Sequence, residues 1–317
     1  MAYLKGFTNL GDSTITNHVR ENLLSFLDYG LIEKSNFENV EIPSSGYYDG
    51  LDHKLRPVSD PRYTDGQVWE SARANWVWES GVGALTSTDN AYPGVSGVYV
   101  GGTFYPVSTT GTYAHHINHP MGRVVFDSAI STSSDVQCEY SYKYINVVKV
   151  DGLQWFSQIQ KNSERSDDAN FIGNSGEWAV LSENRQQLPM IGVEVSPIRR
   201  MEPYQLGGGQ TVFTDFLFHC VADNMYDRDF LVDLICLQNQ KVFDSFDLND
   251  VATNNAFPLD YRGVPVSGAL RYPDLVSTYT GIHIRLVNSR IDSMYSLTPD
   301  IHVGTVKVTT ECILFGV

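Results

Sequence analysis

Residues 210–223 read QTVFTDFLFHCVAD, and residues 227–243, which follow after a short turn, read DRDFLVDLICLQNQKVF. In the first stretch Phe216, Phe218 and Cys220 occupy alternate positions, as in a β-strand with one buried face. In the second, apolar residues recur at three- and four-residue spacing, which predicts an amphipathic helix. We expect the buried side of this helix to carry Phe230, Leu231, Leu234, Ile235, Val242 and Phe243.

Three further segments of the C-terminal half have the composition of strands. They are LPMIGVEVSPIR at 188–199, GIHIRLVNSRI at 281–291 and VGTVKVTTECILF at 303–315. The glycines at 207–209 indicate a turn between the first of them and the strand at 210–223. We therefore expect an antiparallel sheet with the 227–243 helix packed on it.

A second amphipathic helix is predicted near the N-terminus, over Thr16 to Lys34. Its apolar positions form one stripe, made of Val19, Leu23, Leu24, Phe26, Leu27 and Leu31. Thr16 or Asn17 can cap its first turn. We expect this stripe to pack against the 227–243 helix or against the sheet that this helix crosses.

The middle of the chain is rich in turn signals and predicts short, irregular strands. The clearest pattern is VQCEYSYKYINVV at 136–148, which we interpret as one half-buried strand after another at 122–127. Its inward face would carry Val136, Cys138, Tyr140, Tyr142 and Tyr144. The segment 152–165 has the pattern of a short helix, and a polar loop follows up to Gly176.

These elements predict an α+β fold that is β-rich, with antiparallel sheets or a sandwich, an N-terminal amphipathic helix and a second helix packed on a sheet. We divide the chain into three parts. Residues 1–42 form a helical segment that packs on the C-terminal part, 43–150 form a β-rich elaboration, and 151–317 form an α+β domain.

Composition narrows the classes of function. The 317 residues include 18 Tyr and 15 Phe, an abundance that suits both a β-sheet core and extensive subunit contacts. The formal charge is 22 − 37 = −15. Such an acidic surface repels phosphate, so we expect no sequence-specific binding of nucleic acid.

The cysteines indicate a reducing compartment. Cys138, Cys220, Cys236 and Cys312 are far apart and form no C-x-x-C pair, and three of them lie in apolar or alternating runs. We therefore expect free thiols, mostly buried. The chain opens with no signal sequence, and no apolar run approaches the ~18 residues that span a bilayer. We expect synthesis in the cytoplasm and no membrane contact.

The motif HHINH brings His115, His116 and His119 together and is the nearest approach to a metal site. In an extended segment neighbouring side chains point to opposite sides, so at most two of the three converge, whereas zinc needs three or four ligands. We expect a loop of interface histidines and no metal or cofactor.

No catalytic motif is present. The chain lacks the phosphate-binding G-x-x-x-x-G-K-[ST] and the G-x-S-x-G nucleophile elbow. Asp167 and Asp168 lie in a polar segment, and the acidic residues of the 227–243 helix indicate a solvated face with local ion pairs. SFDLND at 245–250 matches a calcium loop only in part. We assign no catalytic residue and expect a protein that is not an enzyme.

The segments HVRENLLSFLDYGLIEKSNFENVEI at 18–42 and DRDFLVDLICLQNQKVFDSFDLND at 227–250, with the turn-rich β section between them, resemble tailed-bacteriophage proteins of the head–tail neck. These are connector, head-closure and tail-terminator proteins. The resemblance covers about half of the chain and contains no diagnostic motif. It implies a structural virion protein, made in the host cytoplasm, that forms a ring of six or twelve copies between a portal-side adaptor and the tail. DNA would pass through the lumen.

The main alternative is a tail-fibre or receptor-binding module that recognises host glycan. Trp69, Trp76 and Trp78 are the aromatic side chains that would stack on sugar rings. The competing interpretation of these tryptophans is packing inside the β unit or at a subunit contact. An enzyme built on a β-sandwich is a third possibility, but no convergent acid and base supports it.

Overall fold

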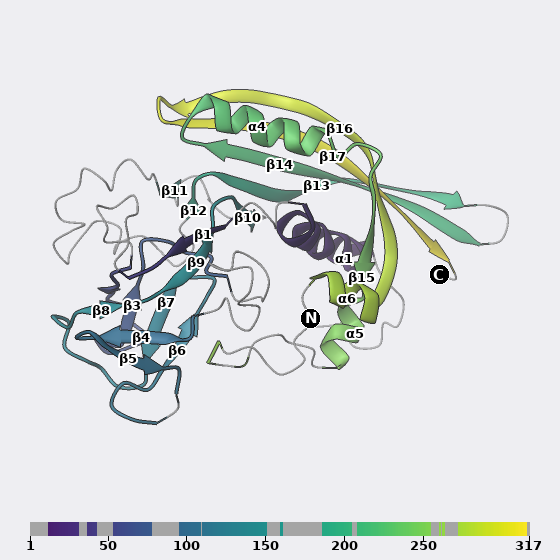
Figure 1. Cartoon of the computed structure of the whole chain (residues 1–317). Coiled ribbons are helices and arrows are strands. Elements are labelled where there is room, and N and C mark those ends of the chain that lie inside the picture. Colours follow the sequence, from purple (N-terminus) through teal and green to yellow (C-terminus); the bar gives the residue numbers. More distant parts are fainter. Residues whose placement is uncertain are drawn as a thin grey trace.

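The structure is a computed structural model, and it describes residues 12–31, 37–42, 53–77, 95–108, 110–150, 159–160, 186–204, 208–254, 260, 262–263 and 272–315. Within these residues the chain is α+β and dominated by strands, as the sequence predicts. A long curved sheet with helices packed on it forms one part, and short strands from the first half of the chain form the other (Figure 1).

The long sheet has six strands in the order β10-β13-β14-β17-β16-β15. Their bounds are β10 Asn146–Lys149, β13 Met190–Tyr204, β14 Gly209–Ala222, β15 Val242–Phe246, β16 Thr280–Thr298 and β17 Ile301–Phe315. All neighbours are antiparallel except β10 and β13. The predicted strands of the C-terminal half are thus confirmed, and β13, β16 and β17 extend beyond the predicted ends.

One face of this sheet is apolar and carries the core. β14 and β17 pair without a register shift, so their even-numbered residues share this face. The core contains residues from the strands and from both helices. They are Phe216, Phe218, Val306 and Val308 of the strands, Val19, Leu23 and Leu27 of the N-terminal helix, and Leu231, Val232 and Ile235 of the second helix. The prediction that the N-terminal helix buries its stripe against the sheet is therefore confirmed, and the second helix packs on the same face.

The N-terminal helix begins earlier and ends earlier than predicted. α1 spans Asp12–Ser25 and continues as one π-helical segment, Phe26–Leu31. Phe26 stacks on Phe243 of β15 with ring centroids 4.4 Å apart. This contact ties the widened last turn of the helix to the sheet.

The second helix is shorter than the apolar pattern suggested. α4 spans Met225–Cys236, and its first turn is capped by the side chain of Asn224, which accepts a hydrogen bond from the backbone N–H of Asp227. Val242 and Phe243 belong to β15 instead, because the chain turns after Leu237 and pairs with β16. The placement of Phe230 on the buried side was wrong, since 56% of it is exposed.

The first half of the chain forms a small β unit with its own core. Its sheets have the orders β2-β3-β7-β6 and β5-β4-β8, and β1 pairs with β9. The bounds are β1 Phe37–Val40, β2 Arg56–Pro57, β3 Val68–Glu70, β4 Gly97–Val100, β5 Thr103–Pro106, β6 His115–Asn118, β7 Arg123–Phe126, β8 Val136–Gln137 and β9 Tyr140–Lys143. The remaining elements are β11 Ile159–Gln160, β12 Gln186–Gln187, α5 Leu248–Thr253 and α6 Tyr272–Thr278.

The single strand predicted at 136–148 is three strands, β8, β9 and β10, in three different sheets. The alternation is kept in part, because Val136, Cys138, Tyr140 and Tyr142 are all buried. Ser141 and Lys143 are buried as well, since neighbouring segments cover the second side of β9. The helix predicted at 152–165 falls outside the described residues except for the two of β11.

Candidate subunit interface

The HHINH motif forms strand β6 and the turn after it, which corrects the expectation of a loop. His115 and His119 are buried, and His116 is half-buried. Nδ1 of His115 lies 2.8 Å from the carbonyl oxygen of Tyr113 and donates to it, but both ring nitrogens of His119 are buried without a hydrogen-bond partner. Among the residues that the structure describes, no three metal-binding side chains come together.

Burial controls the protonation of these histidines. Desolvation lowers the pKa of His119 to about 4, because the charged imidazolium would lose its water without gaining a partner. The pKa of His115 and that of His116 are also lowered, mainly by desolvation. All three rings are therefore neutral at pH 7, and the motif belongs to the interior of the β unit.

Two of the three tryptophans proposed for sugar stacking are in the core of the β unit. Trp69 and Trp76 are 1% and 2% exposed, and Trp76 stacks on Tyr140 with ring centroids 4.6 Å apart. Their indole N–H groups donate to the backbone oxygen of Gly66 and to Oγ of Ser71. Trp78 lies outside the described residues. Trp69 and Trp76 pack the β unit and offer no ring face to a ligand.

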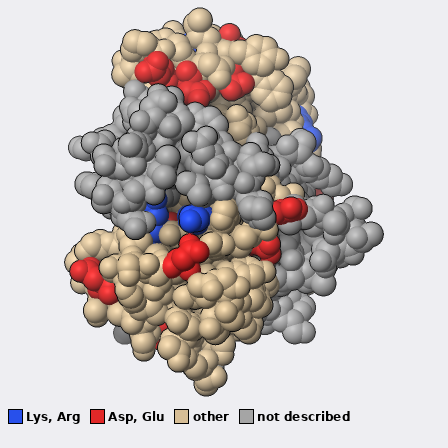
Figure 2. All heavy atoms as spheres, turned by 60° about the vertical axis from the view of Figure 1, so that its left-hand side comes forward, with Lys and Arg blue, Asp and Glu red and all other residues tan. Residues whose placement is uncertain are grey.

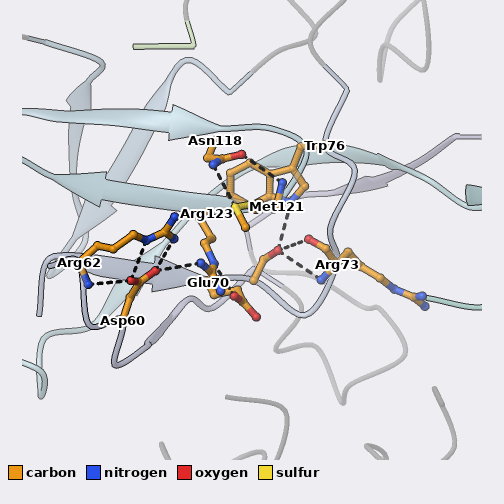
Figure 3. Close-up of polar contacts among 9 residues, drawn as sticks. Asp60, Arg62, Glu70, Arg73, Trp76, Asn118, Met121 and Arg123 are labelled. Atoms are coloured by element: carbon orange, nitrogen blue, oxygen red, sulfur yellow. Dashed lines mark hydrogen bonds and ion pairs between the residues drawn. The ribbon is translucent and has the colours of Figure 1, made fainter. Parts of the chain in front are cut away.

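The densest cluster of charged groups lies beside these tryptophans (Figure 3). Nε of Arg123 donates to Oε2 of Glu70 at 2.6 Å, and Nη1 of Arg123 lies 3.4 Å from Oδ2 of Asp60. Arg62 donates to both carboxylate oxygens of Asp60, at 3.0 and 2.7 Å. Glu70 of β3 and Arg123 of β7 are directly paired across the sheet.

This cluster has the character of a structural clamp. Burial of Asp60 raises the pKa of its carboxyl group. The hydrogen bonds from Arg62 and the positive charges of Arg62 and Arg123 lower this pKa, and together they outweigh the effect of burial. The pKa of Asp60 therefore lies below its usual value. Each carboxylate faces a guanidinium, whereas acid–base catalysis needs two groups whose pKa values are driven apart. The ion pairs instead fix the loop before β3 to the sheet.

Three hydroxyl–histidine pairs resemble parts of a hydrolase triad. In one of them exposed Ser296 lies 2.8 Å from Nδ1 of His302, and in the other two the hydroxyl group is buried. Oγ of Ser245 is fully buried and donates to the carbonyl of Ile282 at 2.5 Å, so His18, 3.0 Å away, can only donate to it. Thr305 lies 3.3 Å from His219, whose other nitrogen contacts Glu194 at 2.8 Å. Thr305 is also buried, and at this position β17 is paired with β14 on one side and with β16 on the other. The backbone N–H groups there take part in the sheet's hydrogen bonds, so they cannot form an oxyanion hole.

The partial calcium motif has a local structural role. Oδ1 of Asp247 accepts hydrogen bonds from the backbone N–H groups of Asn249, at 2.7 Å, and Asp250, at 3.4 Å, at the start of α5. Asp167 and Asp168 lie outside the described residues. The ion pair expected on the second helix is present between Arg228 and Asp229 at 2.7 Å, although Arg228 is buried against the sheet.

The outer side of α4 exposes large apolar side chains to solvent. Tyr226 and Leu237 are each 79% exposed, and Phe230 is exposed between them. Positions 226, 230 and 237 share one side of a helix, and Asp229 and Asp233, both exposed, lie along the same side. α4 is therefore apolar on two opposite sides, and the second apolar stripe has an acidic border.

Strand β16 carries further exposed apolar side chains, on the sheet face that α4 covers. Arg228 and Val232 of α4 pack over Gly304 of β17, and Met294 of β16 is paired with Gly304. Met294 and Ile291 are both exposed, and β15 pairs only with the first part of β16. Register shifts after Leu286, Ile291 and Ser296 mark bulges in the far part of β16. Bulges of this kind bend a strand and blunt an open sheet edge.

The opposite face of the sheet is polar and hollowed. A cavity of about 290 Å³ is lined by Ile198, Arg200, Phe213, Asp215, Val287, Asn288 and Thr309. Asp215 is held by Lys307 and Thr309, both at 2.6 Å. The guanidinium of Arg200 lies 4.5 Å from the ring centroid of Phe213 and reaches Glu202 at 2.9 Å. Phe213, Asp215 and Thr309 are odd-numbered, so the cavity lies on the face away from α4.

Charge is distributed unevenly. Residues 223–233 contain Asp223, Asp227, Asp229 and Asp233 against Arg228, a sum of −4 + 1 = −3. In Figure 2 carboxylates are visible on the upper part of the molecule, which α4 and the long sheet form in Figure 1, and also on the lower part. By contrast, two arginines, Arg199 and Arg200, stand together in the exposed run 198–201, next to Glu202, with which Arg200 forms an ion pair.

The apolar periodicity predicts α4 but not its exposed stripe of Tyr226, Phe230 and Leu237, because the same periodicity places Phe230 in the core. The spacing of these residues could have revealed the stripe. Tyr226, Phe230 and Leu237 lie on one side of a helix, opposite the buried residues Arg228, Leu231, Val232 and Ile235.

No helix in the described part of the chain is long and apolar enough to cross a bilayer. Comparison of the chain with known protein families and with characterised proteins gives no match.

Proposed function

We propose that this protein is a structural subunit of a tailed-bacteriophage particle that forms a closed ring in the head–tail neck and lets DNA pass. The observation that carries the proposal is the exposed apolar stripe of α4; Ile291 and Met294 of β16 are exposed as well. Large apolar side chains gathered on one surface are typical of a protein that assembles.

The remaining observations agree with a role in assembly. The ion pair of Glu70 with Arg123 is buried, and so are the hydroxyl groups of Ser245 and Thr305 that contact histidines. In addition, a net charge of −15 disfavours a protein that grips DNA but suits one that encloses it. The ring of six or twelve copies, the portal-side adaptor and tail as neighbours, and the location in the virion come from the resemblance of 18–42 and 227–250 to neck proteins.

A glycan-binding tail-fibre module is the weaker candidate. Its sugar-stacking groups were Trp69, Trp76 and Trp78, and the first two are enclosed in the core of the β unit.

Two measurements test the proposal. Native mass spectrometry of the purified chain, alone and in ~1 M NaCl, should show closed oligomers that survive salt, because apolar contacts are not screened. Electron cryomicroscopy of purified particles should then place the chain at the head–tail junction and count its copies. A strict monomer in both settings, or density in the tail fibres, would refute the neck-ring proposal.

A further inference from the structure

Three residues from the second half of the chain lie against the β unit of the first half. Asp260, Arg262 and Gly263, which we call the latch, stand between α5 and α6 in the sequence. The latch lies beside β6 (Figure 1), where the backbone N–H of Ile117 donates to the carbonyl oxygen of Arg262 at 2.8 Å. Since α6 packs against β15 and β16 of the long sheet, the latch joins the two parts of the molecule.

The latch covers the edge of a sheet. β6 is the last strand in the order β2-β3-β7-β6, so β7 pairs with one of its sides and the other side is an edge. On this edge the carbonyl oxygen of His115 accepts a hydrogen bond from Nη1 of Arg262 at 3.1 Å, and the N–H of Ile117 is bonded to the same residue. Without such a cover, a strand edge readily pairs with another chain.

The side chains of Asp260 and Arg262 have separate roles. Asp260 folds the latch into a turn, because its Oδ1 accepts the N–H of Arg262 at 2.8 Å and its carbonyl oxygen accepts the N–H of Gly263 at 3.0 Å. Arg262 anchors this turn, since its guanidinium pairs with Asp127 at 3.0 Å and donates to the carbonyl oxygen of Ser108 at 2.9 Å. The planar set of N–H donors of an arginine can hold a carboxylate and backbone carbonyls at the same time.

Gly263 allows the latch to approach the strand. Its φ is +76°, in the region that favours glycine. A Cβ added to it would lie 2.2 Å from the carbonyl oxygen of Ile117 and 3.2 Å from Nδ1 of His119. Any residue other than glycine would therefore displace the latch from β6. The pattern that fits this edge is Asp-x-Arg-Gly.

We propose that the edge of β6, together with Asp127, is a binding site for peptide segments that form an Asp-x-Arg-Gly turn, and that the latch is its autoinhibitory occupant. Main-chain hydrogen bonds to a strand edge give affinity, and an anchored side chain gives specificity. A segment of a partner protein gains access only when the latch opens. This inference is independent of the proposed neck ring.

Opening the latch breaks polar contacts at the surface of the molecule. Asp260 and Asp127 are exposed, so water replaces the hydrogen bonds that they lose. None of the three latch residues has an apolar side chain, and segments with few buried apolar contacts open locally at a low cost in free energy. The latch therefore opens while both parts of the molecule stay folded.

Two variants open the latch through different contacts. Arg262→Ala removes the anchor, and Gly263→Ala places a methyl group against Ile117. Arg285→Ala is the control for the first, because Arg285 also forms an ion pair but lies on the long sheet. Gly208→Ala is the control for the second, because Gly208 has a φ of +91° and a Cβ added to it meets no atom within 4 Å.

Hydrogen exchange of the Ile117 amide reports on the latch directly, since this amide is bonded to Arg262. Its exchange should be ~10-fold or more faster in both latch variants, because hydrogen bonds that position a charged group are lost, and it should keep the parent rate in both controls. The amides of Val124 in β7 and Phe218 in β14 should exchange at the parent rate in all four variants, which shows that both parts stay folded. A parent rate at Ile117 in both latch variants would overturn the latch.

A synthetic peptide of residues 258–265, PLDYRGVP, tests the binding site. At ~1 mM, which is in the range of the effective concentration of a tethered segment, it should slow the exchange of Ile117 in the Arg262→Ala protein towards the parent rate. The peptide with Arg262→Ala should give no protection, and Asp127→Ala added to the protein should abolish the protection by the unchanged peptide. An unchanged peptide without effect, or equal protection by both peptides, would overturn the proposed recognition of the turn.

Discussion

Arg123 and Glu70 face each other across β7 and β3, joined by a 2.6 Å hydrogen bond from Nε to Oε2, with both side chains at most 6% exposed. The pair is the inner half of a four-residue cluster whose outer half, Asp60 and Arg62, reaches solvent through Arg62 alone. A buried pair of this kind adds little net stability over an apolar pair, but breaking it leaves a charge without a partner.

Arg123→Met should therefore lower the free energy of unfolding by about 3 to 5 kcal/mol, because Glu70 and part of Asp60 lose their counter-charge in the interior. Urea titration followed by tryptophan fluorescence measures this directly, since Trp69 directly precedes Glu70 in β3 and Trp76 lies beside the cluster (Figure 3). Arg62→Ala is the matched control, and its loss should be smaller because the Arg62 side chain is 57% exposed. Equal losses for the two variants would contradict the assignment of Arg123 as the inner clamp.

His119 should make the protein sensitive to mild acid. Its pKa is about 4 in the folded state and 6.5 unfolded, so the unfolded chain binds the proton first as the pH falls. The stability that a neutral His119 contributes is complete above pH 6.5, falls between pH 6.5 and 4, and is gone below pH 4. At 1.36 kcal/mol per pKa unit the loss is about 3 kcal/mol, and His18, His115 and His116 act in the same direction.

His119→Leu removes this titration, and it sacrifices no hydrogen bond because neither ring nitrogen has a partner. The urea midpoint of the variant should change less between pH 7 and pH 5 than that of the parent protein. His283→Gln, whose parent ring is 74% exposed beside Asp244, should keep the parent slope. An unchanged slope in His119→Leu would show that other groups cause the acid sensitivity.

The sequence predicted those parts of the fold that have a strong local pattern. α1, β14 and β17 each have one apolar face with a clean period, so the type of these elements was recognisable. Tertiary contacts decided the rest. The run 136–148 has a continuous strand pattern, but three different sheets recruit successive pieces of it. The helix pattern of 227–243 persists past Leu237, yet pairing with β16 claims Val242 and Phe243.

The candidate site was predictable only in part, for a related reason. Apolar periodicity marks a side chain as suited to burial but does not say whether the same chain or another copy buries it, so Phe230 was assigned to the core. The cavity is made by Ile198, Phe213, Val287 and Thr309 from four different strands. Because these residues are far apart in the sequence, no local motif predicts the cavity. The pairing of Glu70 with Arg123 also joins positions 53 residues apart, with no local signal in the sequence.

Leu23 should be among the least replaceable positions of α1. It is fully buried in the core that α1 shares with the long sheet, so Leu23→Asp places an unpaired carboxylate in an apolar cluster. We expect a loss of several kcal/mol, seen as insoluble expression or a strongly lowered melting temperature. Glu21→Gln, on the outer side of the same helix, should express and melt like the parent protein. Parent-like melting of Leu23→Asp would contradict the packing of α1.

The four cysteines should differ sharply in reactivity. All are free thiols, and Cys138, Cys220 and Cys312 are buried, whereas Cys236 is partly exposed. Burial raises the pKa of all four thiols, that of Cys312 to about 12. A disulfide-exchange reagent at pH 8 should therefore label Cys236 first and slowly, and all four only after denaturation. Cys236→Ser should abolish the native reaction; labelling that persists in this variant would place reactivity on a buried thiol.

The last prediction concerns the purpose of the acidity. In a neck ring, part of the carboxylate excess should face the lumen, because every lumenal Lys or Arg would contact phosphate and slow the passage of the genome. Repulsion acts over a Debye length of ~8 Å at physiological salt, which keeps a duplex centred and mobile. We therefore expect no measurable affinity of the isolated protein for duplex DNA in a gel-shift assay, even at low ionic strength, where attraction would be strongest. Tight binding at low salt would contradict a lumenal carboxylate wall.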